Sequence, residues 1–397
     1  MPKTTTYLDY AAATPLDPRV LKAMQPYGKG GFANPSSLHA PGRAARHELE
    51  AARARIAKAL GAKPAEIIFT SGSTEAATIA IQGVARTRHT ARLVASAIEH
   101  EAVQRCLAGM EAEGHQTGVI TVGEQGVVQP DQVVAAIDDL TTLVCVQYAN
   151  NEIGTIQPVA AIAAEIAKIR ADREARGIIR PLYLYCDAAQ AGLLGLQVAR
   201  LGVDLLSLGG TKLYGPAGSG VLYVRTGVHL HPVVFGGGQE NGLRGGSENL
   251  PAAVGLATAL ELIQADRAAE AKRQAALRDG LWQSLRKLDG VTLNGSLKQR
   301  LAGNLNITVE GASGETLVAH LDAAGFAVAT GSACSAANQE PSHVLLALGR
   351  TPQQAASSLR ITLGRPTTKA EVTRLARALA VTIPRVRELS NHEYPVQ

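Results

Sequence analysis

Short apolar runs alternate with amphipathic stretches between about residues 60 and 225, and this alternation restricts the fold more than any other feature of the sequence. Each apolar run has the length of a strand and is flanked by turn-forming or polar residues. The runs are EIIFT, ARLVAS, HQTGVITV, TTLVCVQY, PLYLYCD, DLLSLGG and GVLYVR. Segments 101–114 and 159–177 are long enough to form crossover helices. The pattern predicts an α/β fold in which helices cover both faces of a mainly parallel sheet.

A long helical pattern at residues 250–288 leads into a second, smaller α/β unit. Strand-like runs occur there at VTLNG, GNLNITV and SLRITLG, and helical patterns at GETLVAHLDAAG and KAEVTRLARALAVTI. A chain of 397 residues is too long for one small core, so we expect more than one domain. The prediction is a large domain at residues 14–262 and a small domain formed by residues 1–13 and 263–397.

Charge and hydropathy exclude several classes of protein. The 39 Lys and Arg residues exceed the 34 Asp and Glu residues only slightly and form no basic block, which argues against direct nucleic-acid binding. No apolar run approaches the roughly 20 residues that cross a bilayer. The N-terminus lacks the apolar core of a signal peptide. We therefore expect a cytoplasmic protein that does not bind a membrane.

The four cysteines are widely separated and form no C-x-x-C pair, which is typical of a protein in a reducing compartment. Cys106, Cys145 and Cys186 have apolar neighbours and are expected to be buried. Cys334 differs because it lies among small and polar residues in GSACSAANQEP. This composition predicts an exposed loop, where a thiol is a candidate nucleophile; an incidental surface cysteine is the alternative.

The loops after the strands are the expected ligand site, because parallel sheets bind ligands outside the carboxyl ends of their strands. In FTSGSTEAATIAI a strand is followed by a Gly-Ser-Thr turn and a helix that begins near Glu75. Free N–H groups at a helix N-terminus, beside the hydroxyls of Ser73 and Thr74, predict a phosphate site. An ordinary helix cap of the capping-box kind is the alternative for this segment.

Two consecutive strand-like runs lead to Asp187 and Lys212. A pyridoxal site needs a lysine that forms a Schiff base and a carboxylate that keeps the pyridine nitrogen protonated, so this pair is a candidate for such a site. A lysine that follows an apolar strand within a Gly-rich loop can lose enough solvation to become a usable amine. A salt bridge between strand ends is the alternative.

Further candidate side chains follow other strand-like runs. His100 has the chemistry to stack on a cofactor ring and move protons, or it begins a helix. Asn151 and Gln190 can donate hydrogen bonds to a ring oxygen, or they serve as turn and cap residues. Arg360, in SLRITLGR, carries the planar fork that suits a substrate carboxylate.

Taken together and in this order, the segments resemble the cysteine desulfurases, a branch of the fold-type I pyridoxal-phosphate enzymes grouped with the class V aminotransferases. The resemblance covers essentially the whole chain and includes NPSSLH, IIFTSGSTEA, IEHEAV, NNEIGTIQP, CDAAQ, TKLYGPAG, GGGQE, GSACSAANQEPSHVLLALG and LRITLGR. The long Cys-bearing stretch resembles the subgroup that supplies sulfur for iron–sulfur clusters and tRNA thiolation. The resemblance implies a homodimer that binds pyridoxal 5'-phosphate and L-cysteine and passes sulfur to an acceptor protein.

The resemblance also implies a role for each matching position. Lys212 would bind the cofactor and move the substrate proton, Cys334 would take the sulfur as a persulfide, and His100 would stack on the ring and act as the base. Further cofactor contacts are implied for Ser73, Thr74, Asn151, Asp187, Gln190 and Thr211, and Ser247 would reach the phosphate bound to the partner subunit. The substrate carboxylate would be held by Arg360, with Asn34 and Asn151 nearby. No metal is implied.

Two segments depart from the family pattern. The usual Ser-x-His before the lysine is replaced by Gly209-Gly210-Thr211, and the usual Arg-Ser-Gly-Thr is replaced by Arg244-Gly245-Gly246-Ser247. Changed phosphate contacts predict weaker cofactor binding or an atypical branch of the family. Two alternatives therefore stay open: a pyridoxal-phosphate aminotransferase or lyase without persulfide chemistry, in which Cys334 is dispensable, and a non-catalytic relative that acts as a binding partner.

Overall fold

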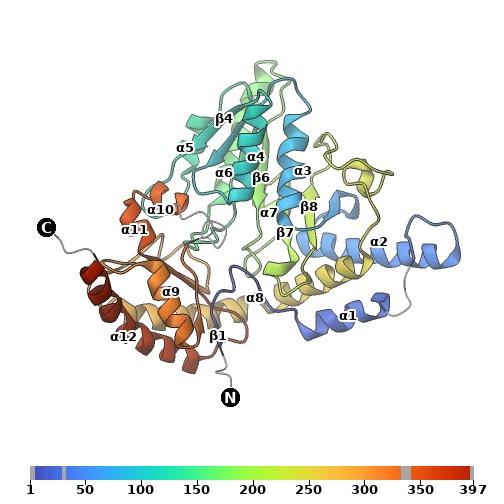
Figure 1. Ribbon diagram of the computed structural model, residues 1–397. Helices are drawn as coiled ribbons and strands as arrows, with labels where there is room; N and C mark the ends of the chain where they lie inside the picture. The colour runs from blue at the N-terminus through green and yellow to red at the C-terminus, as the bar shows by residue number, and fades with distance from the viewer. Residues whose placement is uncertain (1–4, 29–32, 332–340, 394–397) are drawn as a thin grey trace.

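The computed structural model describes residues 5–28, 33–331 and 341–393, with side chains up to residue 389. Cys334, the predicted nucleophile, lies outside these residues. A larger body of secondary structure is built around a central sheet, and a smaller body lies beside it at the lower left of Figure 1. One long helix, α8 (Leu250–Leu285), runs along both bodies.

The central sheet has seven strands in the order β2-β8-β7-β6-β5-β3-β4. Their bounds are β2 (Ile67–Thr70), β3 (Arg92–Ser96), β4 (Gln116–Ile120), β5 (Thr141–Cys145), β6 (Tyr183–Asp187), β7 (Leu205–Gly209) and β8 (Gly220–Val224). β8 is antiparallel to both of its neighbours, and the other strand pairs of the sheet are parallel. Each apolar run between residues 60 and 225 forms one of these strands, so the predicted α/β class is confirmed.

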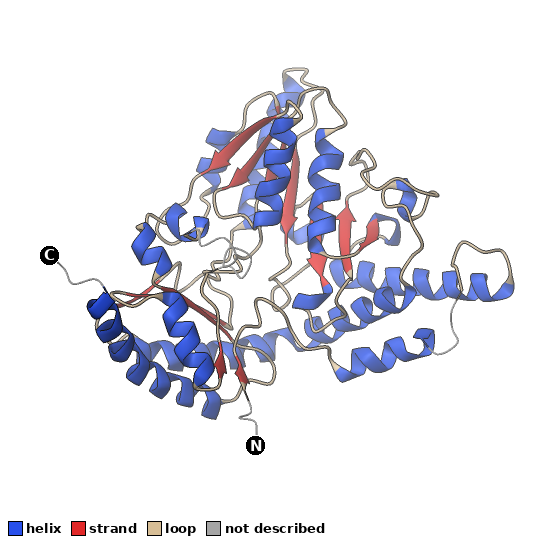
Figure 2. Cartoon of the chain, in the orientation of Figure 1, coloured by secondary structure: helices blue, strands red, loops and turns tan. Residues whose placement is uncertain are grey.

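Helices surround the sheet and fill much of the smaller body (Figure 2). Besides α8, their bounds are α1 (Pro18–Gly28), α2 (Ala40–Leu60), α3 (Ser73–Ala85), α4 (Glu101–Ala112), α5 (Pro130–Ala136), α6 (Val159–Ala175), α7 (Val198–Leu201), α9 (Gly314–Ala323), α10 (His343–Ala347), α11 (Pro352–Ala356) and α12 (Lys369–Glu393). Short 3-10 helices are η1 (Pro64–Glu66), η2 (Gly210–Lys212) and η3 (Glu240–Gly242). Within the described ranges, no helix combines the length and apolar character needed to span a bilayer.

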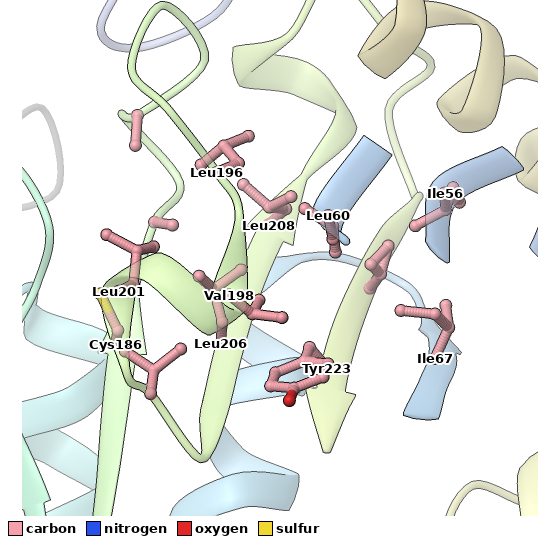
Figure 3. Close-up of a cluster of buried hydrophobic side chains, with 14 of the residues drawn as sticks. Ile56, Leu60, Ile67, Cys186, Leu196, Val198, Leu201, Leu206, Leu208 and Tyr223 are labelled. Carbon is pink, nitrogen blue, oxygen red and sulfur yellow. The ribbon is translucent and has the colours of Figure 1, made fainter. Parts of the chain in front are cut away.

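The strand side chains divide between two cores, one on each face of the sheet. Successive residues of a strand point to opposite faces. In β7, Leu205 therefore joins the core under α3 and α4, whereas Leu206 and Leu208 join the core under α2, α6 and α8. Figure 3 shows Leu206 and Leu208 in this second core, with Ile56 and Leu60 of α2. Burial on both faces explains why these strands read as continuous apolar runs.

The smaller body has its own sheet and its own core. β10 (Asn304–Val309) lies between β9 (Val291–Leu293) and β12 (Ser358–Thr362) in antiparallel pairs, and β1 (Thr6–Tyr7) pairs in parallel with β11 (Phe326–Ala327). Its apolar core joins Leu8 to side chains of α8, α9 and α12. The predicted boundary at residue 262 falls within α8, and the division into two domains stays a prediction.

Candidate active site

A cavity of about 130 Å³ lies beyond the carboxyl ends of β6 and β7, between the larger and the smaller body. Eight of the predicted site residues line it: Ser73, Thr74, His100, Asn151, Asp187, Gln190, Lys212 and Arg360. A second cavity of about 190 Å³ shares Gln190 and Lys212 but is not lined by Asp187 or His100. We place the site in the first cavity because it holds the titratable groups together.

Asp187 is the last residue of β6 and is buried. Its Oδ1 accepts a hydrogen bond from the Ala189 N–H at 2.9 Å, and Ser207 Oγ lies 3.4 Å away. Burial raises the pKa of this carboxyl above its ordinary value, although the Ala189 bond and the nearby His100 and Lys212 act in the opposite direction. The ionised form of this carboxyl therefore gains from a cationic partner in the cavity.

Lys212 ends η2, which follows β7 directly. Its Nζ donates to the backbone oxygens of Ala11, at 2.8 Å, and of Ala12. Gln190 Nε2 donates to the same Ala11 oxygen at 3.0 Å. The N-terminal segment thus fixes two predicted site residues through main-chain carbonyls. Such contacts carry no side-chain signature, so the sequence did not reveal them.

The first turn of α3 faces the cavity with Ser73 and Thr74. Glu75 decides between the two interpretations of this segment, because it does not form a capping box. Its carboxylate instead accepts from the Ser71 N–H and pairs with Arg244 Nε at 2.9 Å. The N-cap is Gly72, which has no side chain to occupy the first N–H groups. These N–H groups therefore remain suited to an anionic ligand.

Gly209 belongs to the segment that departs from the family pattern. A Cβ at this position would lie 3.2 Å from Ser73 Oγ and 3.3 Å from Ser73 N. A side chain here would crowd Ser73, and glycine therefore keeps the start of α3 uncovered on this side. Thr211, two residues on, is not among the described residues that line the cavity, and its backbone oxygen accepts from Thr14.

His100 serves two purposes that the sequence had offered as alternatives. It is the N-cap of α4, where its Nδ1 accepts from the Ala102 N–H at 3.1 Å, and it also lines the cavity. An Nδ1 that accepts leaves Nε2 as the protonated nitrogen of the neutral ring. The cap therefore fixes both the orientation and the tautomer of the ring.

Arg360 lies on β12 and its side chain is 3% exposed. Its Nη2 donates to Asp9 Oδ1 at 2.8 Å, and its Nη1 donates to the Asn151 backbone oxygen at 3.3 Å. Its Nε has no hydrogen-bond partner among the described residues. Asp9 is a residue of the site that sequence reasoning missed, although it lies in the motif YLDYAAATP; an acidic side chain in an N-terminal motif was the available signal.

Three predicted residues lie apart from this cavity. Asn34 is exposed and its Oδ1 accepts from the Ser36 N–H. Ser247 lines a different cavity, with Ser71 and Arg244. Together with Thr211, these residues are not brought to the cavity by the described part of the chain. Cys106, Cys145 and Cys186 are buried as expected.

Comparison with known proteins identifies the family of this chain. The model of the aminotransferase class-V family matches residues 6–375. Cysteine desulfurase IscS of Dictyoglomus turgidum is 41% identical over 395 residues, which cover 98% of both chains. Cysteine desulfurase IscS of Methanosarcina thermophila is 41% identical over 390 residues, which cover 97% of this chain and 93% of that protein. The chain belongs to the cysteine desulfurase family.

Solved structures agree with this assignment. A NifS-like protein superposes with a TM-score of 0.86 at 32% identity and covers 97% of this chain and 99% of its own. A protein described as SspA in complex with cysteine superposes with a TM-score of 0.79 at 34% identity, covering 90% of this chain and 99% of its own. The predicted resemblance and fold class are thus confirmed, and the enzyme is a cysteine desulfurase of the class-V aminotransferases, which depend on pyridoxal phosphate.

Proposed function

We propose that this enzyme converts L-cysteine to L-alanine and transfers the sulfur to Cys334. The observation that carries the proposal is the cavity in which Lys212, Asp187 and His100 meet Arg360. The step is balanced without another reactant. The carbon–sulfur bond of L-cysteine breaks, a sulfur–sulfur bond forms at Cys334, and the proton of the Cys334 thiol ends on L-alanine.

The residues present fit pyridoxal 5'-phosphate. The buried Asp187 carboxyl suits a protonated ring nitrogen, and the start of α3, where the N-cap Gly72 has no side chain and none projects from position 209, suits a phosphate. Lys212 is the amine for covalent attachment, and Asn151 and Gln190 are the expected partners of the ring oxygen. When bound, the cofactor supplies an electron sink that labilises bonds at the substrate α-carbon.

The side chains of the cavity would bind the substrate and transfer protons. Arg360 would orient the substrate carboxylate through its fork. Lys212 Nζ, once released from its backbone partners, would take and return a proton at the substrate. His100 would take the thiol proton of Cys334 at Nδ1, once this nitrogen is released from the Ala102 N–H, because a thiol with a pKa near 8.5 is only a few per cent ionised at neutral pH.

Family behaviour extends the proposal to partners. We propose a cytoplasmic homodimer in which Ser247 reaches the phosphate bound to the partner subunit. The exposed position of Ser247, in a cavity apart from the site of its own chain, supports this role. The persulfide sulfur would pass to an acceptor protein for iron–sulfur cluster assembly or tRNA thiolation.

The proposal is tested with purified enzyme, pyridoxal phosphate, L-cysteine and a reductant. Alanine and sulfide are measured for wild type, Lys212→Ala and Cys334→Ala, with Lys58→Ala and Cys106→Ala as matched controls. We expect wild type and the controls to form both products and the two site variants to release no sulfide. Full activity of Cys334→Ala would instead establish a lyase without persulfide chemistry. A colourless, inert wild type would contradict the proposal and favour a non-catalytic binding partner.

A further inference from the structure

We propose that Asp9 is the positioning residue for the substrate carboxylate: it holds the Arg360 guanidinium in the one orientation that presents its fork to the ligand. This inference rests on the proposed role of Arg360. Asp9 acts through Arg360, since it is Arg360 and not Asp9 that lines the cavity. The two side chains meet across 351 residues of sequence.

Hydrogen bonds to the Asp9 backbone fix the position of this residue. Its backbone oxygen accepts from the Ala12 N–H at 3.0 Å and from the Tyr7 hydroxyl at 2.9 Å. Asp9 also forms a parallel bridge with Thr362, on the same strand as Arg360. The carboxylate therefore has a fixed position relative to β12, and a fixed acceptor can select one orientation of a guanidinium.

The Arg360 guanidinium has five N–H donors on three nitrogen atoms, and the described hydrogen bonds use two of these donors. Nη2 is bound to Asp9 and Nη1 to the Asn151 backbone oxygen. Nε is buried and has no partner within the described part of the chain. Nε is therefore closed off from the cavity, and the donors for a ligand are the second N–H groups of Nη1 and Nη2, which the bonds to Asn151 and Asp9 leave over. A carboxylate is the ligand group that arginine binds best.

Asp9 both orients the Arg360 guanidinium and neutralises its charge, and these two roles predict different effects of substitutions at Asp9. If orientation is what matters, Asp9→Asn keeps an acceptor oxygen in place and preserves binding. Asp9→Glu keeps the charge but moves the carboxylate by one methylene, so it tilts the fork away from the ligand. The proposal commits to orientation, and this pair of conservative variants separates it from a purely electrostatic role.

The experiment measures dissociation constants for two ligands by calorimetry on the enzyme loaded with pyridoxal phosphate. L-Alanine carries the carboxylate, and ethylamine is L-alanine without it. We expect Arg360→Ala and Asp9→Glu each to weaken L-alanine binding about tenfold or more and to change ethylamine binding less than about threefold. Asp9→Asn should stay within about threefold of wild type for both ligands.

Two further variants make the result specific. In the Arg360→Ala background, Asp9→Glu should cause no additional loss of L-alanine affinity, because its effect passes through the guanidinium. Asp17→Asn is the matched control, since Asp17 pairs with Arg365 at 3.1 Å and neither residue lines the cavity. Its L-alanine affinity should equal that of wild type.

The outcomes distinguish the inference from the function on which it rests. If Arg360→Ala binds L-alanine as wild type does, the proposed carboxylate site is wrong. If Arg360→Ala is weak but Asp9→Glu is normal, only the role of Asp9 is wrong. Parallel loss of ethylamine binding in Asp9→Glu would show general damage to the fold and would also overturn the positioning role.

Discussion

Glu99, directly before His100, is a fully buried acid that the proposed chemistry does not use. Its Oε1 accepts from the Gln147 N–H at 2.8 Å and from Ser96 Oγ, and its Oε2 has no partner among the described residues. Burial raises the pKa of Glu99 to about 8, against an ordinary value of 4.5. The carboxyl is therefore protonated in the folded protein at pH 6 and ionised in the unfolded chain.

We expect Glu99→Gln to remove a pH dependence of stability. The unfolded state binds fewer protons than the folded state between the two pKa values, so wild-type stability falls as pH rises through this window. From pH 6 to pH 8 the loss attributable to Glu99 is about 2 kcal/mol, because one pKa unit corresponds to about 1.4 kcal/mol. Urea unfolding of wild type and variant at both pH values measures this difference.

Glu66→Gln is the control for that measurement. Burial raises the pKa of Glu66, but hydrogen bonds from the Lys63 N–H and from Thr226 outweigh burial and lower it below its ordinary value. Glu66 is therefore ionised in both states above pH 6, and its substitution should cost the same at pH 6 and pH 8. Parallel pH profiles of wild type and Glu99→Gln would contradict the assignment of Glu99.

At the scale of elements, α10 is tied to the loop that carries Asn151. Ser342, the N-cap of α10, accepts from the Leu345 N–H at 3.2 Å and donates to Glu152 Oε2 at 2.6 Å. Glu152 is 1% exposed, and its backbone oxygen accepts from Asn304 and Asn306 of β10. One short loop therefore joins the cavity, the smaller sheet and α10.

Ser342→Ala should destabilise the protein more than loss of an ordinary helix cap. It removes a cap, which contributes about 1 kcal/mol, and a hydrogen bond to a buried carboxylate, which contributes about 1.5–3 kcal/mol. We expect a total loss of roughly 2–4 kcal/mol in the free energy of unfolding. Ser313→Ala, at the N-cap of α9, removes a cap alone and should cost about 1 kcal/mol or less. Equal losses in the two variants would exclude a contribution from Glu152.

The sequence predicted those features whose signals are local or follow from topology. Apolar runs buried on both faces identified the strands, and the chain order of a parallel sheet brought Asp187 and Lys212 to neighbouring strand ends. The contacts of Lys212 with Ala11 and Ala12 were not predictable, because a backbone carbonyl looks the same at every residue. The Asp9–Arg360 pair also escaped prediction, since no local pattern links residues 351 positions apart.

At the scale of the whole molecule, the cavity draws its walls from both bodies and from the N-terminal segment. A ligand that binds such a site only in the folded protein stabilises the folded protein by mass action, by about 2.7 kcal/mol when its free concentration is 100 times the dissociation constant. We expect the melting temperature to rise with pyridoxal phosphate concentration. Thermal unfolding monitored by circular dichroism measures this rise.

Pyridoxal, which lacks the phosphate, is the control for that titration. It should raise the melting temperature less than pyridoxal phosphate does at equal concentration, because the first turn of α3 would bind the phosphate. Equal shifts with the two compounds would remove the phosphate site from α3. In Lys212→Ala, both shifts should be smaller, since covalent attachment is lost.

The long sequence separation between Asp9 and Arg360 also determines when this pair forms during protein synthesis. A ribosome adds roughly 5–20 residues per second, so the 351 residues that follow Asp9, up to and including Arg360, take roughly 18 to 70 seconds to synthesise. For almost all of this interval the growing chain contains Ala11 and Ala12, whose carbonyls bind Lys212 in the folded protein. It does not yet contain β12, the strand that carries Arg360. Translation therefore sets the order of assembly, and the capacity to bind cysteine is acquired close to the end of synthesis.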